Sequence, residues 1–292
     1  MSQIENIKES KDKYVLSKLL EDRLFTIYES SFVSQINTPM HGIQNRLVGN
    51  IEETGLKYLL NYQTQRTGDY INLSIYNELY PHLNKAEIFK EPNQGLTLSC
   101  TDNSSELSEI ANNRKSIRDF SGEKISFNVI SNILLNSTNI QIRNGVFHRN
   151  TPSGGGLYPI DIYLFAHNIE GLDQKIYKYN PFYEKLNIID CDPSKIKEVF
   201  KDNSVINFEK SSGIILFTFD YLKVFQKYGE LALSLGLIEI GLISQNIHLF
   251  SVLYGVGTCD IGGFDKPLCE SLLKIDGINT HAVYAIVFGD PA

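Results

Sequence analysis

The clearest predicted β-strand is a segment in which aliphatic residues occupy every second position. Over residues 160–165, isoleucine and leucine at every second position alternate with residues such as Asp161 and Tyr163, and this period of two predicts a strand. Residues 213–219 and 282–288 are short apolar runs, and they predict two further strands that are buried. These three strands should form part of one sheet.

Helical spacing of apolar residues predicts two helices before these strands. The first runs through residues 107–112. The second begins after Ser126, a residue type that often caps helix N-termini. Its apolar residues fall on one face, and they are Val129, Ile130, Ile133 and Leu134. Helices and strands together predict a mixed α+β domain.

Residues 230–254 have the length of a helix but are apolar almost all round. The main polar interruptions are Glu239, Ser244, Gln245, Asn246 and His248. Such a helix has to be buried on several sides, in a domain core or in a subunit interface. We expect it to form the centre of the fold and to support a dimer.

The character of the sequence changes across the polar stretch 101–106. Before it, residues 14–36 combine helical spacing with aromatic residues, and residues 58–83 are rich in Asn, Tyr and Leu without a clean period. We therefore expect an N-terminal extension over residues 1–100, with a peptide-binding or dimer-embracing role. The main domain should then span residues 101–292.

Composition narrows the class of protein. Acidic residues outnumber basic ones by 34 to 27, so the formal charge of −7 has the wrong sign for a general binder of nucleic acid. The four cysteines show no C-x-x-C spacing, which indicates reduced thiols and no metal site. The N-terminus has no apolar signal segment, and no uninterrupted apolar run reaches the roughly 18 residues of a membrane span. We expect a cytoplasmic protein without membrane or nucleic-acid partners.

The first candidate motif is NRKSIRDF at residues 113–120. In an extended chain, Arg114, Ser116 and Arg118 point to one side. Two guanidinium groups around a hydroxyl could seat a phosphate, because arginine offers paired donors and a permanent charge. Taken alone, this motif is explained better by a polar strand face exposed to water.

The second motif is TPSGGGLYP at residues 151–159. Three consecutive glycines remove every Cβ and let backbone amides approach a flat or anionic ligand. Neither a Walker loop nor a G-x-G-x-x-G fingerprint is present. A tight structural turn is the alternative explanation.

The third motif is GVGTCDIGGFD at residues 255–265, which follows the turns that carry Gln245 and Asn246. Amides at Gly262 and Gly263 could donate to the edge of a bound ring. The Gln-Asn pair needs hydrogen-bond partners, because an unpaired buried amide costs roughly 1–3 kcal/mol. Those partners could belong to a ligand or to the protein core.

Taken in order, the motifs R-x-S-x-R-x-F, P-S-G-G-x-x-x-P and Q-N before G-x-G-T-C-x-I-G-G-F-D resemble the FMN-binding series of nitroreductases. The spelling of these motifs, together with KYGE at residues 227–230, is most similar to the SagB-type azoline dehydrogenases, from about residue 107 to residue 291. This resemblance implies an α+β nitroreductase-like fold with an antiparallel-rich central sheet and a long core helix. It also implies a homodimer with FMN at the interface.

The resemblance implies roles for individual residues. Arg114, Ser116 and Arg118 would hold the FMN phosphate. The other residues that would contact the flavin are Pro152, Ser153, Gly154, Gly155, Gln245, Asn246, Gly262 and Gly263. Two features depart from the family pattern, since the C-terminus lacks the usual basic residue and Leu231 follows KYGE where arginine is common.

Lys227 and Tyr228 match the residues that this family uses beside the flavin as base and partner. A lysine at a helix N-terminus meets the positive end of the helix dipole, which favours its neutral, basic form. We therefore expect Lys227 to lie at such a position. Without the resemblance, a lysine pointing outward beside a packing tyrosine would be the simpler interpretation.

The implied reaction oxidises thiazoline or oxazoline rings to azoles in a peptide natural product. Lys227 or Tyr228 would take the ring proton, and a hydride would pass to FMN. The implied partners are an azoline-containing peptide and a cyclodehydratase complex. Two alternatives stay open, namely a general NAD(P)H-dependent nitro, quinone or enone reductase, which needs no such base, and a flavin-poor scaffold subunit of a peptide-modifying complex.

Overall fold

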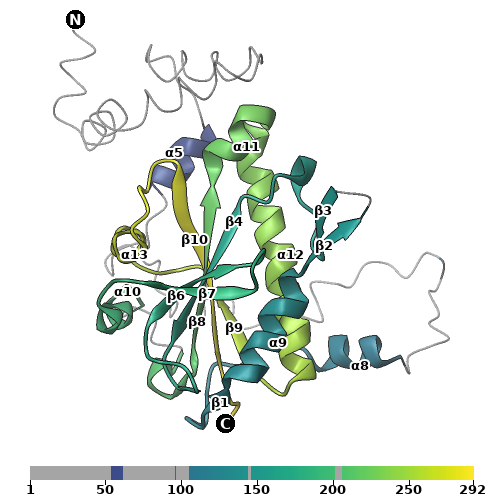
Figure 1. The fold of residues 1–292 in the computed structure, drawn as a ribbon, viewed down its shortest axis with the longest axis vertical. Coiled ribbons are helices and arrows are strands. Elements are labelled where there is room, and N and C mark those ends of the chain that lie inside the picture. The colour runs from purple at the N-terminus through teal and green to yellow at the C-terminus, as the bar shows by residue number, and fades with distance from the viewer. Residues whose placement is uncertain (1–53, 62–95, 97–104, 144–145, 201–205) are drawn as a thin grey trace, which may run out of the picture.

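A six-stranded antiparallel sheet forms the centre of the molecule (Figure 1). The computed structural model describes residues 54–61, 96, 105–143, 146–200 and 206–292. The strand order is β7-β6-β4-β8-β10-β9. The strands are β4 (Ile160–Ala166), β6 (Ile176–Asn180), β7 (Lys185–Ile189), β8 (Gly213–Asp220), β9 (Gly257–Ile261) and β10 (Thr280–Gly289). The predicted α+β fold with an antiparallel-rich sheet is confirmed.

The three strands predicted from the sequence are confirmed as β4, β8 and β10, which lie next to one another in the middle of the sheet. Alternate residues of β4 and β8 enter different hydrophobic cores. Ile162 and Phe217 face the core under the long helix, while Tyr163 and Leu216 face the core on the other side. The alternation in β4 therefore separates two cores rather than a core and a solvent face.

Two short strand pairs lie outside this sheet. The first joins β1 (Ile125–Ser126) in parallel to β5 (Ile169–Glu170). The second is an antiparallel hairpin of β2 (Ile140–Arg143) and β3 (Val146–Arg149). The hairpin leads into the glycine-rich motif and so helps to fix its position.

Helices cover both faces of the sheet (Figure 1). They are α5 (Thr54–Asn61), α8 (Glu106–Asn113), α9 (Phe127–Thr138), α10 (Ile196–Val199), α11 (Tyr221–Tyr228), α12 (Leu231–Leu253) and α13 (Lys266–Leu273), with short 3-10 turns η1 (Gly154–Gly156), η2 (Pro193–Lys195) and η3 (Phe208–Lys210). The two predicted N-terminal helices are confirmed as α8 and α9. Ser126 caps α9 as expected, because its hydroxyl accepts a hydrogen bond from Val129 N at 3.4 Å.

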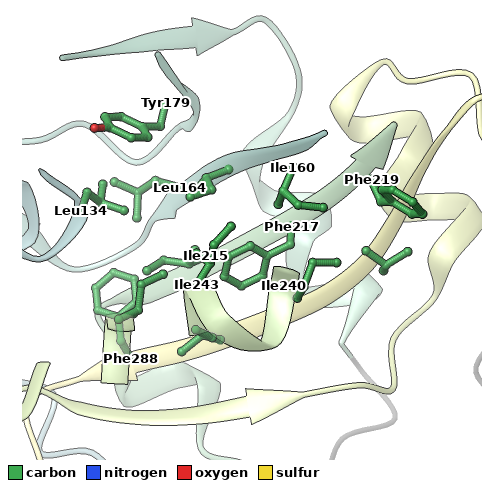
Figure 2. Close-up of a cluster of buried hydrophobic side chains, with 14 of the residues drawn as sticks. Leu134, Ile160, Leu164, Tyr179, Ile215, Phe217, Phe219, Ile240, Ile243 and Phe288 are labelled. Atoms are coloured by element: carbon green, nitrogen blue, oxygen red, sulfur yellow. The ribbon is translucent and has the colours of Figure 1, made fainter. Parts of the chain in front are cut away.

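The long apolar helix is confirmed as α12, which lies along one face of the sheet (Figure 1). On its buried side, Ile240 and Ile243 pack against Ile215 and Phe217 (Figure 2). The opposite side exposes a mainly apolar stripe to solvent in the single chain. Its members are Leu231, Ser234, Leu237, Ile238, Gly241, Leu242 and Gln245.

By length and apolarity alone, the 23 residues of α12 could also cross a membrane. The inner side of the helix is packed on the sheet, as in the core helix of a soluble protein. The exposed stripe is thus a surface that this single chain leaves uncovered, and burial of such a stripe is a common basis of subunit association.

Helix α5, within the first hundred residues, belongs to the main core. Leu56 and Leu59 of α5 are buried in the core under α12. Gly55 N donates to Glu230 Oε2 at 3.2 Å, so α5 is tied to the residue before α12. The features predicted for residues 14–36 and for most of 58–83 lie outside the described residues, and the division at residue 100 stays a prediction.

Candidate functional site

The arginine motif runs beside the edge strand β9. Ile117 N donates to Thr258 O at 2.9 Å, and Ser116 forms a parallel bridge with Thr258. This segment follows α8 and is extended. An extended backbone is compatible with the phosphate seat, which stays a prediction.

A surface cavity of about 480 Å³ opens at this segment. Ser116 and Arg118 line it, together with Lys115 and the C-terminal Ala292. Lys115 was not selected from the sequence, because the one-sided spacing of an extended chain selects only every second residue. Together with Arg118, Lys115 gives this cavity two cations, and both lie near the C-terminal Ala292. Arg114 is half-buried beside the same strand.

A second cavity, of about 350 Å³, lies between α12 and strands β9 and β10. Gln245, His248, Asp260 and Tyr284 are among its lining residues. Burial alone would raise the pKa of Asp260, but hydrogen bonds from His248 and Ser244 and the charge of Arg114 hold it below its ordinary value. Sequence reasoning missed this carboxylate, because it lies inside a glycine-rich motif and contacts α12 only in the folded chain.

The glycine-rich motif forms η1 and contacts the proposed catalytic pair. Gly155 has a positive φ of 62°, and a Cβ there would collide with Lys227 Nζ and Tyr228 Oη. Lys227 Nζ lies 5.4 Å from the centre of the Tyr228 ring. Glycine is therefore required at this position both for its backbone conformation and for the space that the two side chains occupy.

The loop around η1 is held by hydrogen bonds to its neighbours. Tyr158, which has a positive φ of 49°, donates its N–H to Ser153 Oγ at 2.8 Å. Its phenol oxygen accepts a hydrogen bond from Arg149 N at 3.1 Å, and the Arg149 guanidinium lies 5.0 Å from the centre of the tyrosine ring. These contacts fix Ser153 at the entrance to the glycine turn, while Pro152 is exposed.

A buried carboxyl group lies beneath this loop. Glu239 of α12 is only 3% exposed. Burial raises its pKa, while the Ser153 hydroxyl and the charges of Arg149 and Lys223 act in the opposite direction. The sequence identified Glu239 only as a polar interruption of the helix, since its neighbours come from β3 and the loop.

The expected position of Lys227 at a helix N-terminus is wrong. Lys227 lies in the last turn of α11, which ends at Gly229 with a positive φ of 55°. The positive end of the α11 dipole therefore does not lie at Lys227, and the dipole argument for this residue fails.

The remaining predicted residues differ in their surroundings. Gln245 lines the second cavity, and Gly262 and Gly263 are exposed directly after β9. Asn246 instead donates from its Nδ2 to Ser137 O at 3.3 Å. This contact corresponds to the satisfied core amide that the sequence had left open as an alternative.

The predicted site residues form two groups on one chain. The arginine segment, β9 and Gln245 belong to the first group, and η1 with Lys227 and Tyr228 belongs to the second. Gly154 packs against Leu235 of α12, ten residues before Gln245. That separation corresponds to about 15 Å along the helix. In the described residues no cluster of three or more His, Cys, Asp or Glu side chains could hold a metal ion.

Two comparisons with known proteins both match this chain to nitroreductases. A model of the nitroreductase family matches residues 111–290. A curated protein of Methanocaldococcus jannaschii that carries a nitroreductase name is 23% identical over 176 residues, which cover 58% of this chain and 84% of that protein.

Two solved structures are similar in fold. One chain of the E. coli microcin synthetase McbBCD complex, solved with truncated pro-MccB17 bound, has a TM-score of 0.62 at 18% identity, covering 83% of this chain and 95% of that chain. A Ralstonia eutropha protein named as a nitroreductase has a TM-score of 0.55 at 18% identity, covering 69% and 98%. Because the family model spans more than half of the sequence, this chain belongs to the nitroreductase family of oxidoreductases.

Proposed function

We propose that this chain is a cytoplasmic FMN-dependent dehydrogenase that oxidises thiazoline or oxazoline rings in a peptide. The observation that carries the proposal is the contact of Lys227 and Tyr228 with Gly155. A reductase that only delivers hydride to a nitro group or quinone needs no base for a carbon-bound proton. A lysine in its amine form, or a tyrosine in its phenolate form, held at a glycine turn can accept such a proton.

The residues present fit FMN. Ser116, Arg118 and Lys115 provide a hydroxyl and two cations for a phosphate at the first cavity, which Asp119 also lines. Arg114 does not line this cavity, and its charge acts on Asp260 in the wall of the second cavity. The second cavity adjoins the face of α12 and is lined by Gln245. Gly262 and Gly263 expose backbone next to it, and Asn246 contributes through its support of this part of α12 rather than through a free amide.

A homodimer would bring the two groups of site residues together. If two copies of α12 cross antiparallel at Gly241, a position six residues before Gly241 in one copy lies at the same height as the position six residues after it in the other. Leu235, which packs against Gly154, would then lie level with position 247 of the partner, between Gln245 and His248, which both line the second cavity. The stripe that contains Ile238 would be buried by this pairing. The turn at residues 152–156 of one subunit would thus complete the flavin site of the other.

The chain's own residues would handle the proton of the reaction. The ring hydrogen leaves as a proton to Lys227 Nζ or Tyr228 Oη, with Tyr228 placed to share it. Lys227 would accept the proton as a free amine, and enclosure by substrate and partner subunit would keep water away from this exposed side chain. Bound FMN supplies a hydride acceptor for the neighbouring ring carbon, and oxygen or another acceptor would restore its oxidised state.

A half-reaction experiment separates this proposal from its two alternatives. Under anaerobic conditions, an azoline-bearing peptide should bleach the oxidised flavin absorbance of the purified protein, whereas NADH and NADPH should not. Bleaching by the nicotinamides alone would favour the general reductase. Absence of flavin from the protein, even after incubation with FMN, would favour the scaffold subunit.

The proposed partners are an azoline-containing peptide and a cyclodehydratase complex that forms the azoline. One similar structure is part of a synthetase complex with a bound propeptide, which supports a peptide substrate and an assembly for this chain too. At a sequence identity of 18%, the similarity between the two chains by itself shows only a shared fold. Co-purification with a cyclodehydratase would test the assembly.

Replacing Ile238 by arginine should break the dimer and release FMN. Ile238 is 60% exposed in the single chain, so an arginine fits the free subunit but places an unpaired charge in the interface. Sedimentation and flavin absorbance should show a flavin-poor monomer. As a control, Ile188→Arg changes a residue that is 58% exposed on β7, away from α12, and should leave both properties unchanged. An FMN-loaded monomer of the Ile238 variant would contradict the intersubunit site.

Replacing Arg114 by alanine should weaken FMN binding. A hydrogen bond to a charged group contributes about 1.5–3 kcal/mol, so the affinity for FMN should fall roughly ten- to hundredfold. Riboflavin, which lacks the phosphate, should bind the variant and the parent equally. The two affinities can be measured by quenching of flavin fluorescence, and unchanged retention of FMN would remove Arg114 from the site.

A further inference from the structure

A hydrogen-bonded network fixes one carboxylate in the wall of the second cavity. Asp260 Oδ1 accepts a hydrogen bond from Ser244 Oγ at 2.6 Å, and its Oδ2 lies 2.8 Å from His248 Nε2. Ser244 and His248 are 4% and 2% exposed, whereas the side chain of Asp260 is 35% exposed. Asp260 is therefore the member of the network that a ligand can reach.

The support behind this carboxylate is rigid. His248 Nδ1 lies 2.6 Å from Thr258 Oγ1, so both nitrogens of the imidazole ring have partners. Each carboxylate oxygen of Asp260 uses one acceptor position within the protein, and an ionised carboxylate has about four. The remaining positions can accept hydrogen bonds from a ligand in the cavity.

The position of Asp260 along β9 indicates which part of a ligand it meets. Thr258 and Asp260 fall on one face of β9 by alternation, and both bond to α12. Gly262 follows Asp260 by two residues, just after the strand ends. Thr258 lies beside Ser116 of the proposed phosphate seat, and Gly262 belongs to the proposed ring edge. Asp260 thus lies midway between Thr258 and Gly262, at about 7 Å from each along the chain.

FMN carries its groups in the same order, with a phosphate, then a polyol chain, then the ring. The polyol hydroxyl groups are hydrogen-bond donors, and a carboxylate is a strong acceptor for them. We infer that Asp260 accepts hydrogen bonds from the ribityl hydroxyl groups of FMN, and that His248, Ser244 and Thr258 are positioning residues that hold it. This inference rests on the proposed binding of FMN.

The test compares two flavins that differ only in the hydroxyl groups. The first is FMN, and the second is a flavin phosphate whose chain is an alkyl group of the same length. The parent protein should bind FMN roughly ten- to hundredfold more tightly than the alkyl analogue. Asp260→Asn should lose this preference and bind both flavins about equally. Ser244→Ala should reduce the preference by a smaller factor, because it removes one of the two donors that orient Asp260.

Controls separate this contact from a general loss of structure. Asp161→Asn changes a carboxylate on β4 that pairs with Lys178 at 2.6 Å, and it should keep the parent preference. An equal loss of affinity for both flavins in Asp260→Asn, or unchanged binding of FMN, would overturn the inference while leaving the proposed function in place. A parent protein that binds neither flavin would instead overturn the proposed function.

Discussion

Replacement of Lys227 by alanine is expected to lower the rate of azoline oxidation roughly 10²–10⁴-fold, which is the usual contribution of a positioned general base. FMN should stay bound, because Lys227 contacts the glycine turn and Tyr228 rather than the proposed phosphate seat. The fold should be little affected, since the side chain is exposed and such changes usually stay within about 0.5 kcal/mol. Initial rates per bound flavin measure the effect.

Tyr228→Phe should lower the same rate by a smaller factor, because it removes the phenol oxygen but leaves the lysine in place. Lys185→Ala, an exposed lysine on β7, serves as a control and should keep the parent rate. If the Lys227 variant oxidised azolines at the parent rate while holding FMN, the base assignment would be wrong. The general reductase would then become the better interpretation.

The second large effect concerns stability and a buried ion pair that is not part of the proposed site. Lys266 Nζ lies 2.5 Å from Glu270 Oε1 and 3.2 Å from His281 Nδ1, beneath α13. Lys266 and His281 are 3% and 0% exposed. Lys266→Met should lower the free energy of unfolding by about 3–5 kcal/mol, because it leaves the Glu270 carboxylate buried without its cation. Urea unfolding at fixed protein and FMN concentrations would measure the loss.

The loss should depend on pH. Burial raises the pKa of Glu270 above its ordinary 4.5 even in the parent, and removal of the lysine raises it further. The folded variant then binds more protons than the unfolded chain above pH 4.5, so its stability should fall as the pH rises through that range. The double variant with Glu270→Gln should recover much of the loss. An unchanged urea midpoint for Lys266→Met at pH 8 would contradict the role of this pair.

The features that the sequence predicted correctly are local and periodic. The strands β4, β8 and β10 follow from runs and alternation, and α9 follows from its cap at Ser126 and its apolar face. The length of α12 follows from a single long segment that is apolar almost all round. Each of these signals lies within one element, where side-chain periodicity alone determines which residues are buried.

The features that the sequence did not predict depend on contacts between elements. The pairing of His248 with Asp260 joins α12 to β9, and the pairing of Lys266 with His281 joins α13 to β10. Neither contact produces a periodic pattern of residues in the sequence. The dipole argument for Lys227 failed for a local reason, because KYGE was read as the start of a helix. Gly229 is a typical residue after a helix C-terminus, so it could have shown that α11 ends there.

The central claim is the oxidation of azoline rings, and mass spectrometry of a peptide tests it most directly. The FMN-loaded protein is incubated in air with a peptide that carries a defined number of thiazoline or oxazoline rings. The account predicts that the peptide loses two hydrogen masses per ring, and that the Lys227→Ala protein gives far less of this product in the same time. A peptide mass that stays unchanged with fully flavin-loaded protein, for both ring types, would contradict the account.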